Sequence, residues 1–265
     1  MECKNPIICK KHGTLVSLTE HANNIYRFLI AENPYDEDQI RDWFKICSGI
    51  TKVGYTEGIH NNSWIICGPA GEYDDAKSKY LETLLLQLTW FTYIWGGFES
   101  LIDSLSFPDC PQQRGKINKV SFYLQNNYES RFKLPEYYNN LVTLLTNYLK
   151  LTPSFLDTDK NLFNPSQCSG KSGLGLTLVY KIRNGFAHGA FEFGEPDEYQ
   201  LTKSYHTRII HISCRIILLT IQMLLLTIHK DYNIEIEPNW AFNENEETIS
   251  AIDFLQNLHL RDYKS

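Results

Sequence analysis

Two long stretches of apolar residues with helical spacing constrain the fold of this chain most. In the second stretch, Ile216–Ile228, three polar residues interrupt an otherwise apolar run. It is shorter than the roughly 20 apolar residues that cross a bilayer, and the first stretch carries two glutamates. Both are therefore expected to be buried core helices, without membrane contact. The first stretch has a large apolar residue every three or four positions: Tyr80, Leu84, Leu88, Phe91, Trp95, Phe98, Leu101 and Leu105.

The overall charge argues against one class of function. The 265 residues carry a formal net charge of −6, so the molecule is not a cationic coat for nucleic acid. Any RNA contact is expected to be local. The start, Met1–Pro6, lacks the features of a secretion signal, and the seven cysteines include no Cys-x-x-Cys pair. These features predict a cytoplasmic protein.

Neither a metal site nor a nucleotide phosphate loop is predicted. Cys3, Cys9 and His12 have the spacing of half a zinc site, but no second pair of ligands follows. Gly170-Lys171-Ser172 has the end of a phosphate-binding loop, but Pro165 stands where that motif needs glycine. We expect no cofactor, and we expect residues 170–175 to form a flexible turn.

The pattern of elements predicts a mainly α protein in three segments. Residues 1–73 read as a small α+β appendage of unknown role, with a capping box at Ser17, a short helix over residues 36–47 and a strand over residues 63–67. Residues 74–230 form a helical bundle, in which Gly96-Gly97 indicates either a kink or a close helix contact. Residues 231–265 form an extension packed on the bundle, with an edge strand over 232–237 and a helix over 246–260.

The segment 174–189 carries the most informative side chains. On a helix, Leu178, Val179, Ile182 and Phe186 share one face, whereas Arg183, Asn184 and His188 lie on the other. Asn184 and His188 are i, i+4 neighbours, but Arg183 lies roughly 140° from His188 around an ideal helix. Either the arginine side chain wraps round the helix, or a partner chain completes a site. A cationic histidine followed by glycine is also a common way to end a helix, and this reading stays open.

The residues Arg183-Asn184-x-x-Ala187-His188-Gly189 resemble the signature of the HEPN superfamily (higher eukaryote and prokaryote nucleotide-binding domains). That signature is an arginine, usually followed by a polar residue, and a histidine four to six positions after the arginine. The context is also similar, because a long apolar helix follows the motif and an earlier long helix carries an acidic residue, here Glu99. The resemblance covers about residues 74–230.

The resemblance implies a compact helical bundle that dimerises around the motif. Many members are metal-independent endoribonucleases of toxin–antitoxin, abortive-infection and CRISPR systems. The resemblance implicates Arg183 and His188 in catalysis, with Asn184 as their polar companion. It also implies an antitoxin, activator or defence-system partner. A tyrosine two residues after the motif histidine marks the subgroup controlled by a nucleotidyltransferase antitoxin. This chain has Ala190 there, so that mode of control is not expected.

These residue types suit RNA cleavage independently of the family. Cleavage without a metal needs the 2′-hydroxyl deprotonated, the leaving 5′-oxygen protonated and the charge on the phosphorane stabilised. Histidine exchanges protons near neutral pH, and arginine offers a permanent, planar charge to phosphate oxygens. Products with a 2′,3′-cyclic phosphate and a 5′-hydroxyl are therefore expected.

Other residues are candidates for supporting roles. Glu99 lies in so apolar a helix that it needs a partner, such as Arg183 or His188, unless it faces the surface. Five cations near the motif are candidates for contact with an RNA backbone, although each alone also reads as a solvated charge. The sequence thus predicts a homodimeric ribonuclease acting as a toxin or antiphage effector. The alternatives are a HEPN-like module that binds RNA, a nucleotide or a protein without catalysis, and a helical scaffold. The five cations are Lys171, Lys181, Lys203, His206 and Arg208.

Overall fold

The computed structural model describes residues 15–32, 38–59, 68–105, 107, 114–152, 170–189, 193–196, 205–231, 235–236 and 249–261. The described part is mainly α-helical, as predicted, with eight helices and one two-stranded sheet. The elements in chain order are α1 (Leu18–Glu32), α2 (Asp38–Gly49), α3 (Gly68–Ser104), α4 (Lys116–Asn127), α5 (Tyr138–Leu151), α6 (Gly170–Ala187), α7 (His206–Ile228), β1 (Glu235–Ile236), β2 (Ile249–Ser250) and α8 (Ala251–Asn257).

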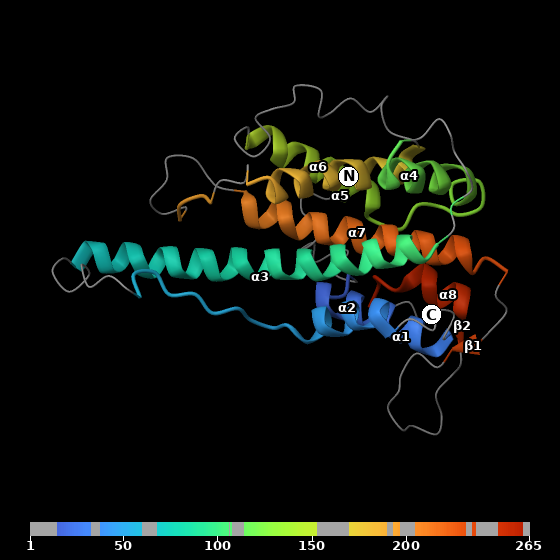
Figure 1. Cartoon of the computed structure of the whole chain (residues 1–265), viewed down its shortest axis with the longest axis horizontal. Helices are drawn as coiled ribbons and strands as arrows, with labels where there is room; N and C mark the ends of the chain where they lie inside the picture. The colour runs from blue at the N-terminus through green and yellow to red at the C-terminus, as the bar shows by residue number, and fades with distance from the viewer. Residues whose placement is uncertain are drawn as a thin grey trace, which may run out of the picture.

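Helix α7 is the centre of the fold. It packs against α3, α5, α6 and α8, and Figure 1 shows α4, α5 and α6 on one side of α3 and α7, with α1, α2 and α8 on the other. By length and composition α7 is apolar enough to cross a membrane, but 94% of its apolar window is buried inside the fold. Burial on all sides is what an all-round apolar helix needs in water. The two long apolar stretches are therefore core helices, as expected.

Helix α1 begins at the predicted capping box. The Ser17 hydroxyl accepts a hydrogen bond from the Glu20 backbone N–H at 3.1 Å, and the Glu20 carboxylate accepts one from the Ser17 N–H at 3.4 Å. The backbone N–H of Val16 donates to the carbonyl of His259, so the start of the described chain is tied to its end. The predicted strand 63–67 lies outside the described residues.

The Gly96-Gly97 pair marks a close helix contact. A Cβ atom at Gly96 would lie 2.8 Å from the Trp43 ring, and one at Gly97 would lie 2.7 Å from the Phe44 ring. The two glycines thus let α2 pack directly onto α3, which continues as one helix through them. Because α3 begins at Gly68, the predicted boundary between residues 73 and 74 falls inside this helix.

The expectation of a flexible turn over residues 170–175 is wrong, because these residues are the first turns of α6. The Glu129 carboxylate accepts hydrogen bonds from both the backbone N–H and the hydroxyl of Ser172, at 2.7 Å each. A carboxylate at this position accepts hydrogen bonds from free amides at the N-terminus of the helix, and its negative charge interacts favourably with the helix dipole. A Cβ at Gly173 would lie 2.6 Å from Ser121 Cβ, so glycine is needed there for the close packing of α6 on α4.

The C-terminal extension contains a strand and a helix, as predicted; the described part of the strand is residues 235–236, and the helix is shorter than predicted. β1 pairs with β2 in antiparallel register, so the strand's partner is a segment that the sequence assigned to the last helix. Helix α8 begins only after Ser250, whose hydroxyl accepts from the Asp253 N–H at 3.1 Å. Phe28 from α1, Leu218 from α7 and Phe254 from α8 belong to one hydrophobic cluster, which joins residues from all three predicted segments.

Candidate functional site

The last turn of α6 presents the predicted site residues. Leu178, Val179 and Ile182 are buried, which confirms the apolar face predicted for this helix. Arg183 and Asn184 are partly exposed on the remaining surface. As the periodicity predicts, one face of α6 packs in the core and the polar residues on the other face remain accessible.

Arg183 pairs with Glu99 across the gap between α6 and α3. The distance from Arg183 Nη2 to Glu99 Oε1 is 3.9 Å, which confirms the pairing that the sequence left open. The side chains are 35% and 45% exposed, so the pair contributes little to stability and leaves the guanidinium open to a ligand. Glu99 thus orients Arg183 without burying it.

Two aromatic rings, which were not among the predicted site residues, lie beside this ion pair. The guanidinium carbon of Arg183 lies 5.9 Å from the centre of the Trp95 ring, within reach of a cation–π contact. Tyr180 stacks on Trp95 with ring centres 6.3 Å apart and an interplanar angle of 16°. The sequence spacing could have indicated both rings. Trp95 and Glu99 are i, i+4 neighbours on one helix, and Tyr180 and Arg183 are i, i+3 neighbours on another.

His188 lies just past the end of α6. Its backbone N–H donates to the Asn184 carbonyl at 3.0 Å, and the Gly189 N–H donates to the Phe186 carbonyl at 3.1 Å. Gly189 has a φ of +70°, so the glycine that ends the helix adopts the left-handed conformation expected of a C-terminal cap. The His188 side chain is exposed, and it has no hydrogen bond or ion pair within the described part of the chain. The capping role and an available imidazole are both compatible with this position.

The structure separates the five candidate RNA-binding cations. Lys171 is exposed at the start of α6, Lys181 is partly exposed, and Arg208 is exposed in the first turn of α7. His206 is only 5% exposed, which corrects its predicted contact with an RNA backbone, because a buried ring cannot reach a phosphate. Lys203 lies outside the described residues.

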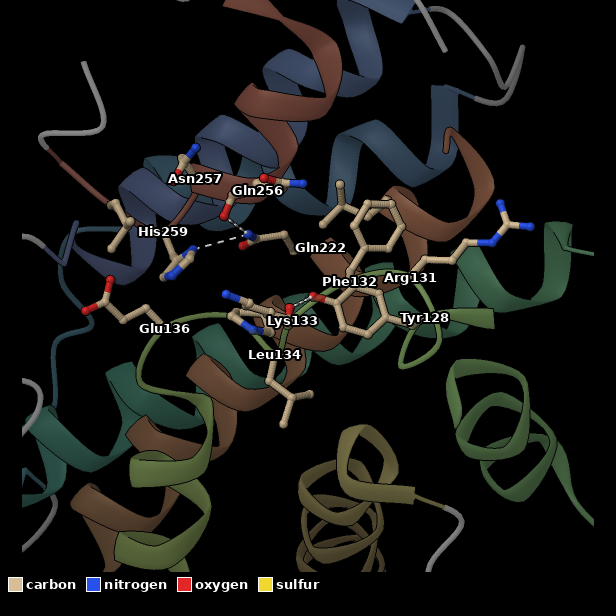
Figure 2. A pocket seen from close by; sticks show the side chains of 13 residues that line it. Tyr128, Arg131, Phe132, Lys133, Leu134, Glu136, Gln222, Gln256, Asn257 and His259 are labelled. Carbon is tan, nitrogen blue, oxygen red and sulfur yellow. Dashed lines mark hydrogen bonds between the residues drawn. The ribbon is translucent and has the colours of Figure 1, made fainter. Parts of the chain in front are cut away.

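A cavity of about 370 Å³ lies elsewhere, between the segment after α4 and the ends of α7 and α8. Figure 2 shows Gln222 and His259 on one side of it and the segment from Tyr128 to Glu136 on the other. The Gln222 amide nitrogen donates to the Gln256 carbonyl at 2.9 Å and contacts His259 Nδ1 at 3.2 Å. Since an amide nitrogen only donates, Nδ1 accepts and the imidazole proton lies on Nε2. Burial lowers the pKa of His259 to about 4, so this ring is neutral at pH 7.

No predicted site residue lines this cavity. Its walls come from three segments far apart in the sequence, and none of them carries a motif. Within the described residues, no three His, Cys, Asp or Glu side chains lie close enough to hold a metal ion. Cys3, Cys9 and His12 are outside that part, so the expected absence of a metal site stays a prediction.

Comparison with known proteins gives no relative for this chain: no family model matches it, and no curated protein or solved structure matches it significantly.

Proposed function

We propose that this chain is a metal-independent endoribonuclease of the HEPN type. The observation that carries the proposal is the end of α6: Arg183, Asn184 and His188 are all accessible there, and Glu99 orients the arginine. A helix end with a purely structural role needs Gly189, but it does not need an arginine and an asparagine on the exposed surface beside an available imidazole.

Each residue has a chemical role in this proposal. His188 transfers a proton, either from the attacking 2′-hydroxyl or to the leaving 5′-oxygen. Arg183 binds the phosphate and stabilises the charge that develops on the phosphorane, and Asn184 orients the phosphate or the imidazole. Glu99 is a positioning residue, since it contacts the guanidinium and not the substrate.

We further propose that two copies of the chain form the site. Arg183 extends toward Glu99 and Trp95 on α3, whereas His188 lies beyond the helix end. In a homodimer, the arginine of one copy and the histidine of the other can face the same phosphate. This arrangement answers the angular separation of the two residues along α6.

The proposed setting is the cytoplasm, as a toxin or antiphage defence effector that an antitoxin, activator or defence-system partner controls. The motif resemblance supports the toxin or defence role and the controlling partner.

The test uses end-labelled single-stranded RNA and tRNA with the purified protein, with and without EDTA. We expect cleavage that survives EDTA and leaves a 2′,3′-cyclic phosphate and a 5′-hydroxyl. His188→Ala and Arg183→Ala are expected to abolish cleavage. The matched control is Arg131→Ala, which removes an exposed arginine at the cavity in Figure 2, away from the site.

The outcomes separate the candidate functions. RNA binding without cleavage by a folded dimer would favour the non-catalytic module. Cleavage that persists in His188→Ala would remove the assignment altogether. For the two-chain site, mixing the inactive Arg183→Ala and His188→Ala proteins is expected to restore activity, since one of the two sites in a mixed dimer keeps both residues. No restoration after subunit exchange would contradict that arrangement.

A further inference from the structure

A second group of arginine and aromatic residues lies at the junction of α5 and α7, and the proposed chemistry does not use it. Tyr148 of α5 and Tyr205, which precedes α7, stack with ring centres 4.9 Å apart and an interplanar angle of 20°. The guanidinium carbon of Arg208 lies 5.8 Å from the centre of each ring, and its Nη1 donates to the Tyr148 hydroxyl at 3.4 Å.

These distances show that the guanidinium is shared between the two rings and does not lie over the outer face of one of them. A point equally distant from both ring centres lies in the plane midway between the two rings. The guanidinium carbon is 5.8 Å from each centre, and the centres are 4.9 Å apart, so Arg208 contacts both rings at once. The arginine therefore does not cover the outer ring faces, and both rings are partly exposed.

The charge of Arg208 is also available. The side chain is exposed and forms no ion pair with any described residue, in contrast to Arg183. Its two tyrosine contacts hold it in place without neutralising it. A fixed, unpaired guanidinium beside a stack of rings suits a phosphate next to a nucleobase.

This group lies at the same end of the bundle as the proposed site. A Cβ at Gly175 would lie 2.8 Å from Ile216 and 3.0 Å from Val142, so α5, α6 and α7 are in close contact at the height of Gly175 along the bundle. From that level, α6 runs toward His188 against the direction of α7 (Figure 1). Arg183 is eight residues further along α6 and Arg208 eight residues back along α7, about 12 Å in each case.

We infer that Tyr148, Tyr205 and Arg208 form an anchor for single-stranded RNA, in which a base stacks on the tyrosine pair and Arg208 binds the adjacent phosphate. The inference rests on the proposed function and adds the form of its substrate. Unpaired bases expose their faces to aromatic side chains, whereas the bases of a duplex are already stacked on each other. With a net charge of −6 over the chain, affinity must come from such local groups.

The test measures binding in a His188→Ala background, so that it does not depend on cleavage. The probes are a fluorescein-labelled 12-nucleotide uridine-rich RNA and a hairpin RNA without single-stranded ends, followed by fluorescence anisotropy. Arg208→Gln and Tyr205→Leu are expected to weaken binding of the single strand about tenfold or more, the loss of one base–aromatic stack or one phosphate contact. Hairpin binding is expected to change less than threefold, and Arg131→Gln is the control for loss of an exposed arginine elsewhere.

Tyr205→Leu removes part of a packed ring, so its thermal melt is measured alongside, and Arg208→Gln gives an independent reading at an exposed position. Unchanged affinity for the single strand in Arg208→Gln overturns the anchor, as does an equal loss for single strand and hairpin or no binding of the single strand at all. Selective loss without any ribonuclease activity of the wild type would support the anchor while removing the nuclease.

Discussion

Buried histidines should make this protein sensitive to mild acid. His229 and His259 are buried and His211 is partly exposed, and desolvation lowers the pKa values of His211, His229 and His259 from 6.5 to about 3, 4 and 4, respectively. The pKa of His21 is lowered in the same direction, mainly by burial. In the folded protein these rings stay neutral well below the pH at which they protonate in the unfolded chain. Stability is therefore complete above about pH 6.5 and decreases as the pH falls toward 4.

The size of the effect follows from the pKa values. Consider one histidine with a pKa of 6.5 in the unfolded chain and about 4 in the folded protein. Between pH 7 and pH 5, its protonation in the unfolded chain lowers the stability of the protein by about 2 kcal/mol. Three such residues lose about 6 kcal/mol, which is comparable to the total stability of about 5–15 kcal/mol of a typical domain. We therefore expect the protein to unfold, or to come close to unfolding, near pH 5.

Urea unfolding between pH 8 and pH 5, followed by tryptophan fluorescence, measures this dependence. In His259→Gln the difference in unfolding free energy between pH 7 and pH 5 should shrink by about 2 kcal/mol, whatever the variant's stability at pH 7. A stability that is constant from pH 7 to pH 5, or a His259→Gln profile parallel to that of the wild type, would refute the reasoning.

Two further predictions concern packing and capping. Gly173→Ala should destabilise the protein by about 1–3 kcal/mol, because the new Cβ would lie 2.6 Å from Ser121 Cβ. The control is Gly71→Ala, whose Cβ meets nothing within 4 Å and should not destabilise the protein. Differential scanning fluorimetry compares the two variants, and equal melting temperatures would contradict the packing effect. Ser17→Ala should cost about 1 kcal/mol by removing the cap of α1, measured by urea unfolding, whereas Ser17→Asp, which keeps a capping oxygen, should cost less; equal losses would show that the hydroxyl does not act as a cap.

Periodicity and capping predicted the helical framework because both depend on residues close in sequence. The apolar faces around Leu88 and Ile182 are buried as expected, and the Ser17 cap is in place. The pairing of Glu99 with Arg183 was also within reach, since an acid on an apolar helix needs a partner.

The failures involve residues whose environment depends on distant parts of the chain. Residues 170–175 read as a turn because glycine is a poor helix former, but Glu129 caps this helix and α4 needs its small residues for close packing. His206 reads as a surface cation, but it is buried at the start of α7. No local pattern could place Tyr148 against Tyr205, because the contact joins α5 to the residue before α7, far away in the sequence.

The most direct test of the proposed ribonuclease uses two RNA oligonucleotides that differ by one oxygen atom. The first contains a bond that the wild-type protein cleaves in EDTA, and the second has a 2′-deoxy nucleotide on the 5′ side of that bond. If His188 and Arg183 promote attack by the 2′-hydroxyl, cleavage stops at the substituted bond and continues at other sites. Cleavage of the deoxy-substituted bond, or no cleavage of either oligonucleotide by the folded protein, would contradict the account.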